Sequence, residues 1–438
     1  MTPRRPLSPA AAGPISRRGF AVRTGGGLAA TAAALHAVPA LAQAKTPVKI
    51  GVLLPLSGPL ATLGNDVYRG FQMAQEWVNA EGGVFGAPVE FAVADVPSST
   101  EAVSQANRLI SKDGVKVIVG SYASSISIPA SQVAERNKVI YLEQGAVADE
   151  VTKRGFKYLF RMIYPATTLG AGGARFVTDT IAPGCGLELS KMKVALLTED
   201  SSNGSAIAEG AKAWLAKMNV NVVDATSYSY KTTDMSSMVQ RYKSVQPDVL
   251  IACQYTPDCI LFARQSREAG LNFKAVIGNG GGHNVGEYAD ALMDDVNGVF
   301  NAGTSININP AGLTPETAVL FKRFHEEHRK KHAGREPSAH TGMGFTAMYL
   351  LLKRILPDAG SMDTEKIRQA ALALDLPAGS TIVGWGVKFD PATQSNTRAF
   401  PTYDQWRARK IVTIAPEAFS LAKPVAMPLP VWGKRGAI

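Results

Sequence analysis

The sequence predicts an α/β fold with two doubly wound lobes, each built on a mostly parallel sheet. Short apolar runs alternate with amphipathic helical segments, and they do so in two successive series, each long enough for a domain. The size of the chain agrees with this. Its 438 residues, 46% hydrophobic and 19% charged, suffice for two or three ordinary globular domains.

The first series opens with residues 49–55, Lys-Ile-Gly-Val-Leu-Leu-Pro, a continuous apolar run closed by proline. Such a run is typical of a strand buried on both faces of a parallel sheet. In Gly64–Asn79 the apolar residues recur at helical spacing, which predicts a helix with one buried face. The series continues with strands expected at 89–93, 116–119 and 139–142, and with helices expected at 98–110 and 129–136.

The second series starts near residue 166 and repeats the pattern. Its helices are expected at 169–181, 205–218, 235–245 and 259–269, and its strands at 192–197, 220–225, 248–252 and 274–277. Three further helices follow at 314–331, 342–355 and 364–372, then a late strand pair at about 387–389 and 410–414. A proline-rich tail, residues 421–438, is expected to wrap the surface.

Residues 1–44 have the features of an export signal. They carry five arginines and no acid, and so account for half of the net charge of +10. Residues 16–22, Ser-Arg-Arg-Gly-Phe-Ala-Val, resemble a twin-arginine signal, and Ala42-Gln43-Ala44 fits a cleavage site. A membrane anchor is disfavoured because the Ala/Gly-rich stretch between them, 25–41, is too weakly apolar. We therefore expect a mature protein in the periplasm, with cleavage near Ala44.

Several kinds of chemistry lack support in the sequence. The charge left after residue 44 is mild and no basic block interleaves with aromatic residues, which argues against nucleic acid as a partner. No phosphate loop or dinucleotide fingerprint occurs, so no cofactor is expected. His325, His328 and His332 lack the spacing of a zinc protease, and their charged surroundings favour a solvated helix face over a metal site. Cys253 and Cys259 could pair, although buried thiols are the simpler interpretation.

Residues 117–132, VIVGSYASSISIPASQ, raise the question whether their serines attack a substrate or hold a ligand. The nucleophile-elbow pattern G-x-S-x-G is absent around Ser124, and of the histidines that follow the signal only His283 falls in a loop after a strand. Holding fits better, because a hydroxyl at the start of a helix can donate to a carboxylate while the helix dipole favours an anion.

The loops after the strands are the expected place for a ligand. In open parallel sheets a ligand lies outside the carboxyl ends of the strands, and two α/β lobes usually bind it where they face each other. The loops concerned are residues 55–64, 120–127, 143–147, 199–204, 254–256 and 278–284.

These segments, in this order and spacing, resemble a known family. Residues 49–59, KIGVLLPLSGP, are similar to the start of type I periplasmic solute-binding proteins, above all the Leu/Ile/Val-binding receptors of ABC importers. Residues 119–130, 143–161, 194–204, 248–255 and 278–284 follow in register, so the resemblance covers about 47–415. It implies no enzyme activity, and a monomer that captures a small molecule and delivers it to an ABC permease of the inner membrane.

The resemblance also implies the domain organisation. The family has two α/β lobes joined by three crossover segments, and it closes over its ligand by a hinge. Carried over to this chain, one lobe comprises 45–165 with about 304–385, and the other comprises 166–303 with about 386–420.

The resemblance assigns the binding residues position by position. Ser124 falls where the family binds the ligand carboxylate, next to Tyr122, and the following segment supplies backbone contacts. Leu63 falls where an aromatic residue often lines the pocket. The second lobe contributes three contacts. The segment that supplies backbone contacts in lobe one is Gly145, Ala146 and Val147, and the three contacts from lobe two are Asn203, Tyr255 and Gly280.

One departure from the family bears on the ligand. Gly280 takes the place of the acid that pairs with the ligand ammonium in amino-acid receptors, and a buried ammonium without countercharge costs several kcal/mol. A small organic acid with an apolar body, or an atypical amino acid, is therefore favoured over leucine. Two alternatives stay open: a ligand-sensing module of the same fold for an amide or urea, and a periplasmic serine hydrolase that uses Ser124.

Overall fold

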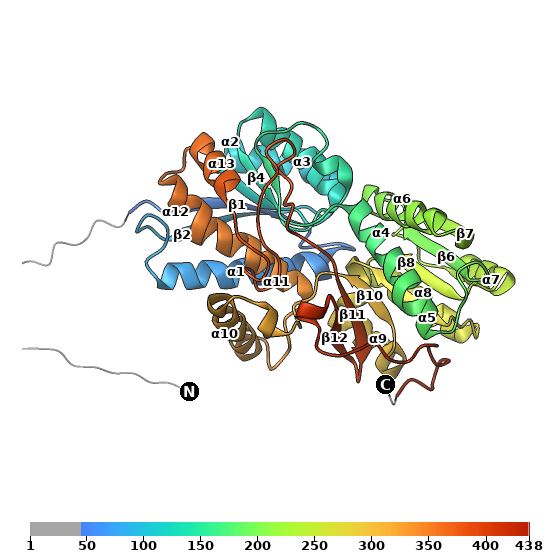
Figure 1. Cartoon of the computed structure of the whole chain (residues 1–438). Helices are drawn as coiled ribbons and strands as arrows, with labels where there is room; N and C mark the ends of the chain where they lie inside the picture. Colours follow the sequence, from blue (N-terminus) through green and yellow to red (C-terminus); the bar gives the residue numbers. More distant parts are fainter. Residues whose placement is uncertain (1–44, 437) are drawn as a thin grey trace, which may run out of the picture. The chain divides into compact units, whose positions relative to one another are not determined.

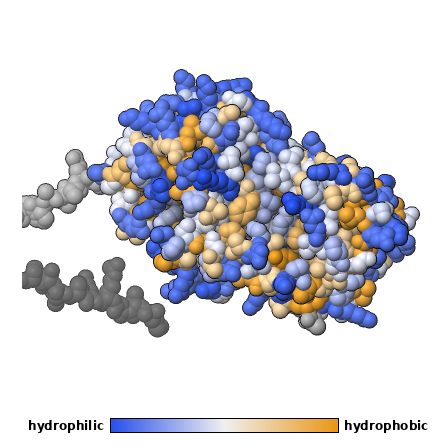
Figure 2. Space-filling model, in the orientation of Figure 1, coloured by the Kyte–Doolittle hydropathy of each residue, from blue (hydrophilic) through white to orange (hydrophobic). Residues whose placement is uncertain are grey.

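Two sheets form the scaffold of the protein in the computed structural model, which describes residues 45–436 and 438 (Figure 1). Residues 45–438 form one compact unit. The predicted export signal lies outside the described residues. Within them, no helix is both long enough and apolar enough to cross a membrane. On the face drawn in Figure 2, hydrophilic residues cover most of the surface and apolar ones are interspersed among them.

The first sheet is parallel and has the strand order β2-β1-β3-β4-β5. Strand β1 lies between β2 and β3, pairing Val48 with Val89 and Gly51 with Ile118. Every residue of β3 and β4 is buried, as expected for a sheet covered on both faces. The strands are β1 (Val48–Leu54), β2 (Val89–Asp95), β3 (Val117–Gly120), β4 (Ile140–Glu143) and β5 (Leu159–Arg161).

Helices from both ends of the chain cover this sheet. In Figure 1 the orange helix α11 lies beside the blue helix α1, and the two pack closely because Gly70 and Gly344 have no side chains. A Cβ on Gly70 would lie 2.1 Å from the Thr341 carbonyl oxygen. The helices are α1 (Ala61–Ala80), α2 (Ser99–Ser111), α3 (Ser124–Arg136), α10 (Pro315–Lys331), α11 (Ala339–Leu350), α12 (Leu356–Ala359) and α13 (Thr364–Ala373).

The second sheet has the order β12-β11-β10-β9-β8-β6-β7, parallel from β7 to β10 and antiparallel at β11 and β12. Its strands are β6 (Lys193–Glu199), β7 (Asn221–Tyr228), β8 (Val249–Cys253), β9 (Ala275–Asn279), β10 (Phe300–Gly303), β11 (Thr402–Arg407) and β12 (Lys410–Ala415). Its main helices are α4 (Ala166–Phe176), α6 (Ser202–Lys217), α7 (Ser236–Val245), α8 (Thr256–Glu268) and α9 (Gly286–Leu292). Two short segments, Val177–Ile181 and α5 (Ala182–Gly184), continue α4.

The chain passes between the sheets at residues 162–165, 304–314 and 374–401. The predicted fold class is confirmed, with two α/β layers built on parallel-dominated sheets. The lobe boundaries given above stay predictions.

Three local predictions were wrong. The late strand pair is β11 with β12, while Val387 and Phe389 form only isolated bridges, with Leu376 and Asn396. Strands β5 and β10 were not predicted, because β5 has only three residues and Asn301 interrupts the apolar run of β10. Helix α3 begins at Ser124 and not at Pro129, so the serines belong to its first turns.

The tail packs against the second sheet. The Leu421 amide donates to the Thr413 carbonyl at 2.8 Å and the Leu429 amide to the Lys274 carbonyl at 2.7 Å. Arg435 is buried, its Nε donates to the Pro430 carbonyl at 2.9 Å and its guanidinium stacks 3.9 Å from the Trp432 ring centre. The first two contacts tie the tail to β12 and to the residue before β9, while the Arg435 contacts named here lie within the tail itself.

Candidate ligand-binding site

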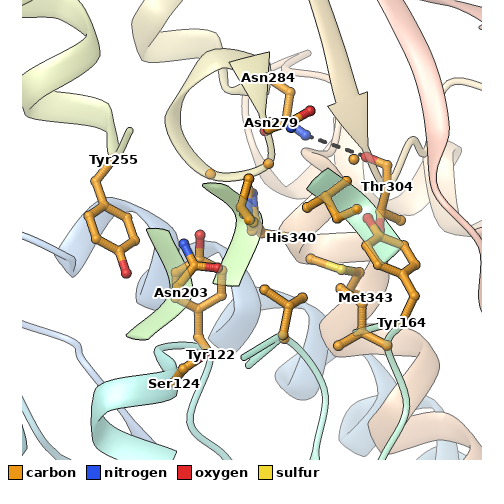
Figure 3. Close-up of a pocket in the computed structure, with 18 residues that line it drawn as sticks. Tyr122, Ser124, Tyr164, Asn203, Tyr255, Asn279, Asn284, Thr304, His340 and Met343 are labelled. Atoms are coloured by element: carbon orange, nitrogen blue, oxygen red, sulfur yellow. Dashed lines mark hydrogen bonds between the residues drawn. The ribbon is translucent and has the colours of Figure 1, made fainter. Parts of the chain in front are cut away.

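A small cavity of about 50 Å³ lies where the strand ends of the two sheets face each other (Figure 3). It adjoins a larger cleft of about 1310 Å³, with which it shares Asn284 and Thr304. The first sheet's loops and helices contribute Tyr122, Ser124, Gly145, Val147, His340 and Met343, and the crossover after β5 contributes Ile163 and Tyr164. The second sheet, its helices and the loops that follow its strands contribute Leu169, Asn203, Ile207, Tyr255, Asn279, Gly280, Gly281, Asn284, Gly303 and Thr304.

The cavity brings together most of the residues predicted to bind the ligand. Two of the predicted residues lie outside its lining: Leu63 is buried in the hydrophobic core, and Ala146 is fully buried behind the loop. The predicted residues that line the cavity are Tyr122, Ser124, Gly145, Val147, Asn203, Tyr255 and Gly280.

The buried Glu143 at the end of β4 organises the first-lobe side. Its carboxylate accepts backbone N–H groups from two loops: Ser121 at 2.5 Å, Tyr122 at 3.2 Å, and Gly145 and Ala146 at 2.8 Å each. Burial raises the pKa of Glu143, while these hydrogen bonds act in the opposite direction. The amides of Gly145 and Ala146 are therefore engaged inside the protein and not free for a ligand.

Ser124 keeps a proton to donate. Its Oγ accepts the Ala148 N–H at 3.0 Å, and its hydroxyl hydrogen has no acceptor among the described residues. Ser124 is also the first residue of α3, a helix whose N-terminus has no side-chain cap. The Val147 N–H, on the same wall, likewise has no acceptor in the described part of the chain. A hydroxyl, a free amide and a helix N-terminus together suit a carboxylate.

On the second-lobe side, Glu199 plays a similar part. Its carboxylate accepts the N–H and the hydroxyl of Ser201 at 2.6 and 2.8 Å and the Asn203 amide nitrogen at 3.0 Å. The same nitrogen contacts Cys253 Sγ at 3.4 Å, so the remaining free polar atom of Asn203 is its carbonyl oxygen. Cys253, Cys259 and the third cysteine, Cys185, are all free thiols, and the disulfide left open above does not form.

None of the residues that line the cavity carries a charge. Gly280 lines it with a φ of 74°, a conformation that suits glycine. The carboxylate of Glu199 is occupied by Ser201 and Asn203, and burial raises its pKa. The cavity therefore offers a ligand hydroxyls, amides and an imidazole, but no countercharge for an ammonium group.

Tyr122 is held in a rare conformation beside Ser124. Its φ is 74°, which is unusual for a residue with a side chain, and its N–H is bound by Glu143. Its ring lies against the backbone of Gly145, where an added Cβ would come 3.0 Å from Cδ2. Burial raises the pKa of Tyr122 and of Tyr255, so both phenols stay protonated and can donate.

Sequence reasoning missed the contribution of α11 and of the crossover segments. His340 and Met343 enter the cavity from α11, while Tyr164 and Thr304, whose hydroxyls lie 3.2 Å apart, come from crossovers. The available signal was a histidine at the start of an otherwise apolar helix.

The other histidines lie away from the cavity. The expectation of a solvated face for the α10 histidines was wrong for His328, whereas His325 and His332 are partly exposed and line the larger cleft. His328 is buried with Nδ1 3.0 Å from the Arg335 carbonyl, and His325 contacts the Ile306 carbonyl at 3.2 Å. Within the described ranges no group of three or more acidic, cysteine or histidine residues is placed to hold a metal. His283 is buried against Tyr288 and does not line the cavity, so it is not positioned to activate Ser124.

A buried polar network beside the second-lobe wall predicts a pH dependence. Burial raises the pKa of Asp258 to about 7, and Tyr228, itself 3.1 Å from Gln254, donates to it. The folded protein therefore holds this proton more tightly than the unfolded chain. The protonated Asp258 therefore stabilises the folded state by at most about 4 kcal/mol. This stabilisation is fully present below about pH 4 and is lost as the pH rises through about 7.

Asp258→Asn should flatten the fall of the free energy of unfolding between about pH 5 and pH 8, measured by urea titration. The exposed Asp200 provides the control, since Asp200→Asn should leave the dependence of the unfolding free energy on pH as in the wild type. If the free energy of unfolding changes with pH in the same way for the wild type and Asp258→Asn, this proton is not linked to folding.

Comparison with known proteins adds family-level findings. Residues 47–403 match the family model described as periplasmic binding protein. Two curated proteins of Brucella suis biovar 1 (strain 1330) are similar: Leu/Ile/Val-binding protein homolog 7, 34% identical over 87% of this chain and 94% of its own, and homolog 8, 37% identical over 88% and 94%.

Solved structures with the same fold have lower identity. The leucine binding protein LivK of Thermotoga maritima superposes with a TM-score of 0.72 at 24% identity, over 84% of this chain and 98% of its own. LivJ of Streptococcus pneumoniae, in complex with isoleucine, superposes with a TM-score of 0.72 at 22% identity, over 86% of this chain and 100% of its own. A solute binding protein of R. palustris, in complex with benzoate, superposes with a TM-score of 0.69 at 18% identity, over 88% of this chain and 100% of its own.

Proposed function

The chain belongs to the periplasmic binding protein family, and from this premise we propose that it captures a small carboxylate-bearing solute between its lobes and delivers it to an ABC permease. Proteins of this family bind solutes and are not enzymes. Capture by closure requires contacts from both sides that form only when the lobes meet. The cavity meets this requirement, since Ser124 lines one wall and Asn203 and Tyr255 line the other. Export by the twin-arginine route with cleavage near Ala44 is part of the same proposal.

Ser124 and its surroundings support a carboxylate as the group that is bound. Its hydroxyl hydrogen, the Val147 N–H and the start of α3 all lie at one wall of the cavity. Hydrogen bonds to a charged acceptor contribute about 1.5–3 kcal/mol each, more than neutral ones. The site therefore provides for an anion without a basic side chain.

The absence of any charged side chain from the lining carries the finer proposal, that the solute has no amine. An amino acid would bring its ammonium group into a cavity with no carboxylate to pair with it. The relatives from Brucella are named for leucine, isoleucine and valine, whereas a structural neighbour holds benzoate, an acid without an amine. Both kinds of ligand thus occur on this fold, and the uncharged lining favours the second for this chain.

Matched ligand pairs test this proposal in the purified protein. Leucine, valine and phenylalanine are compared with isocaproate, isovalerate and hydrocinnamate, which have the same carbon skeletons without the amine. A ligand at a hundredfold excess over its dissociation constant stabilises the protein by about 2.7 kcal/mol, visible as a thermal shift. We expect shifts with the acids and weak or no shifts with the amino acids. Stronger shifts with the amino acids would overturn the amine-free assignment, and no shift with either set would overturn the carboxylate assignment.

A further inference from the structure

His340 is a buried polar residue of the cavity that the proposed function does not use. It lies in the first turn of α11, is 3% exposed and lines the cavity, and Figure 3 shows its ring near the middle of the drawn residues. Its ring packs edge-to-face on Tyr122, with centroids 5.2 Å apart. Neither ring nitrogen has a hydrogen-bond partner among the residues that the structure describes, and Nδ1 is fully buried.

An unpartnered nitrogen at this depth is costly. Buried polar side chains are nearly always hydrogen-bonded, and leaving one without a partner costs about 1–3 kcal/mol. A hydrophobic side chain of similar size would fill the same space without that cost. The nearby Asn284 shows the same feature, since its nitrogen donates to the Thr304 carbonyl at 3.4 Å while its buried Oδ1 has no partner in the described chain.

The imidazole is neutral in this environment. Burial lowers the pKa of His340 to about 4, and the groups that line the cavity around it, Tyr122 included, carry no charge. A neutral imidazole has one nitrogen that donates and one that accepts. It can thus bind a hydroxyl or a carbonyl oxygen, but it gives no ionic attraction to a second charge.

We propose that His340 determines specificity by binding a second, uncharged oxygen group of the ligand, so that the preferred solute is a hydroxy- or oxo-substituted carboxylic acid and not a plain hydrocarbon acid. This inference rests on the proposed function, in which Ser124 holds the carboxylate. Ser124 and His340 line the same small cavity, and the His340 ring packs on Tyr122, two residues before Ser124.

The chain contains a matched control in His283. It is 2% exposed, its Nδ1 is also buried without a partner, its pKa is likewise lowered by burial to about 4, and its ring packs edge-to-face on Tyr288 at 5.2 Å. It differs from His340 in lying outside the cavity lining. If His340 had only a structural role, replacing His340 or His283 by leucine should change the ligand preference in the same way.

The test compares acids that differ by one oxygen group, using calorimetric titration of the purified protein. Isocaproate is set against its α-hydroxy and α-oxo derivatives, and benzoate against para-hydroxybenzoate. In the wild type we expect at least one oxygenated acid to bind about tenfold more tightly than its parent, which corresponds to about 1.4 kcal/mol. This preference should be the same at about pH 6 and pH 8, because the imidazole stays neutral.

His340→Leu should remove the preference by weakening the oxygenated acid, and His340→Gln, which can still donate and accept, should retain part of it. His283→Leu should leave the preference as in the wild type. Parent acids that bind as tightly as their oxygenated derivatives in the wild type, or a preference that survives in His340→Leu, would overturn the inference while leaving the carboxylate site intact. Failure of every acid to bind would instead overturn the proposed function. If His340→Leu does not fold, the wild-type comparison and His340→Gln decide.

Discussion

Ser124→Ala is expected to weaken binding of a carboxylate ligand by roughly 10- to 100-fold, because it removes one hydrogen bond to a charged acceptor. The structure gives the reason: Oγ already accepts the Ala148 N–H at 3.0 Å, so its hydrogen is available to the ligand. Titration calorimetry with a ligand identified from the acid panel measures the effect. The same substitution leaves the Ala148 N–H without an acceptor, so a loss of about 1 kcal/mol in folding stability accompanies it.

Ser125→Ala is the matched control, since Ser125 is the next residue of α3 and does not line the cavity. It should bind the ligand as the wild type does. Equal affinities for wild type and Ser124→Ala would contradict the assignment of the carboxylate to this wall. The comparison also separates binding from catalysis, because a hydrolase would lose turnover in Ser124→Ala, whereas a binding protein has no turnover to lose.

Glu143→Gln is expected to lower the free energy of unfolding by about 2–4 kcal/mol, although the two side chains have nearly the same shape. The carboxylate accepts four backbone N–H groups, and an amide turns one of those acceptors into a donor that faces them. Because these N–H groups belong to the loops that carry Tyr122 and Gly145, ligand affinity should fall as well. Urea unfolding monitored by circular dichroism measures the first effect, and calorimetry the second.

Glu150→Gln provides the reference. Glu150 is exposed in the short helical turn Asp149–Val151, and its carboxylate does not accept a set of backbone N–H groups as that of Glu143 does. It should change stability by less than about 0.5 kcal/mol. If Glu143→Gln unfolds at the same urea concentration as the wild type, the carboxylate does not organise the loops as described.

The order of the elements was predictable because buried parallel strands and their helices leave strong periodic patterns. Strands β1, β3 and β8 are nearly continuous apolar runs, and their positions predicted the loops that line the cavity. Ser124 followed from one such loop. Strand β11, Thr402–Arg407, contains Asp404 and Gln405 in its middle, and these polar residues hid it because the pattern cannot show that the sheet buries them.

What the sequence could not predict depends on contacts between distant segments. His340 reaches the cavity only because α11 packs on α1 through Gly70 and Gly344, and no local pattern reports that packing. The amides of Gly145 and Ala146 were expected to bind the ligand, but Glu143, two and three residues earlier, already occupies them. The sequence thus predicted which loops line the cavity, but it could not predict which backbone N–H groups in them are already hydrogen-bonded within the protein.

The tail and the β11–β12 hairpin have a consequence for how the protein is made. The first sheet is complete once residue 161 has been synthesised, whereas β10 pairs with β11, which begins at residue 402. Until then a nascent chain presents the edge of β10 unpaired, and the contacts of Arg435 form only with the last residues. Exposed strand edges template association with other chains. Prematurely terminated products that end before residue 402 would therefore expose this edge and be prone to aggregation, although all five strands of the first sheet are present.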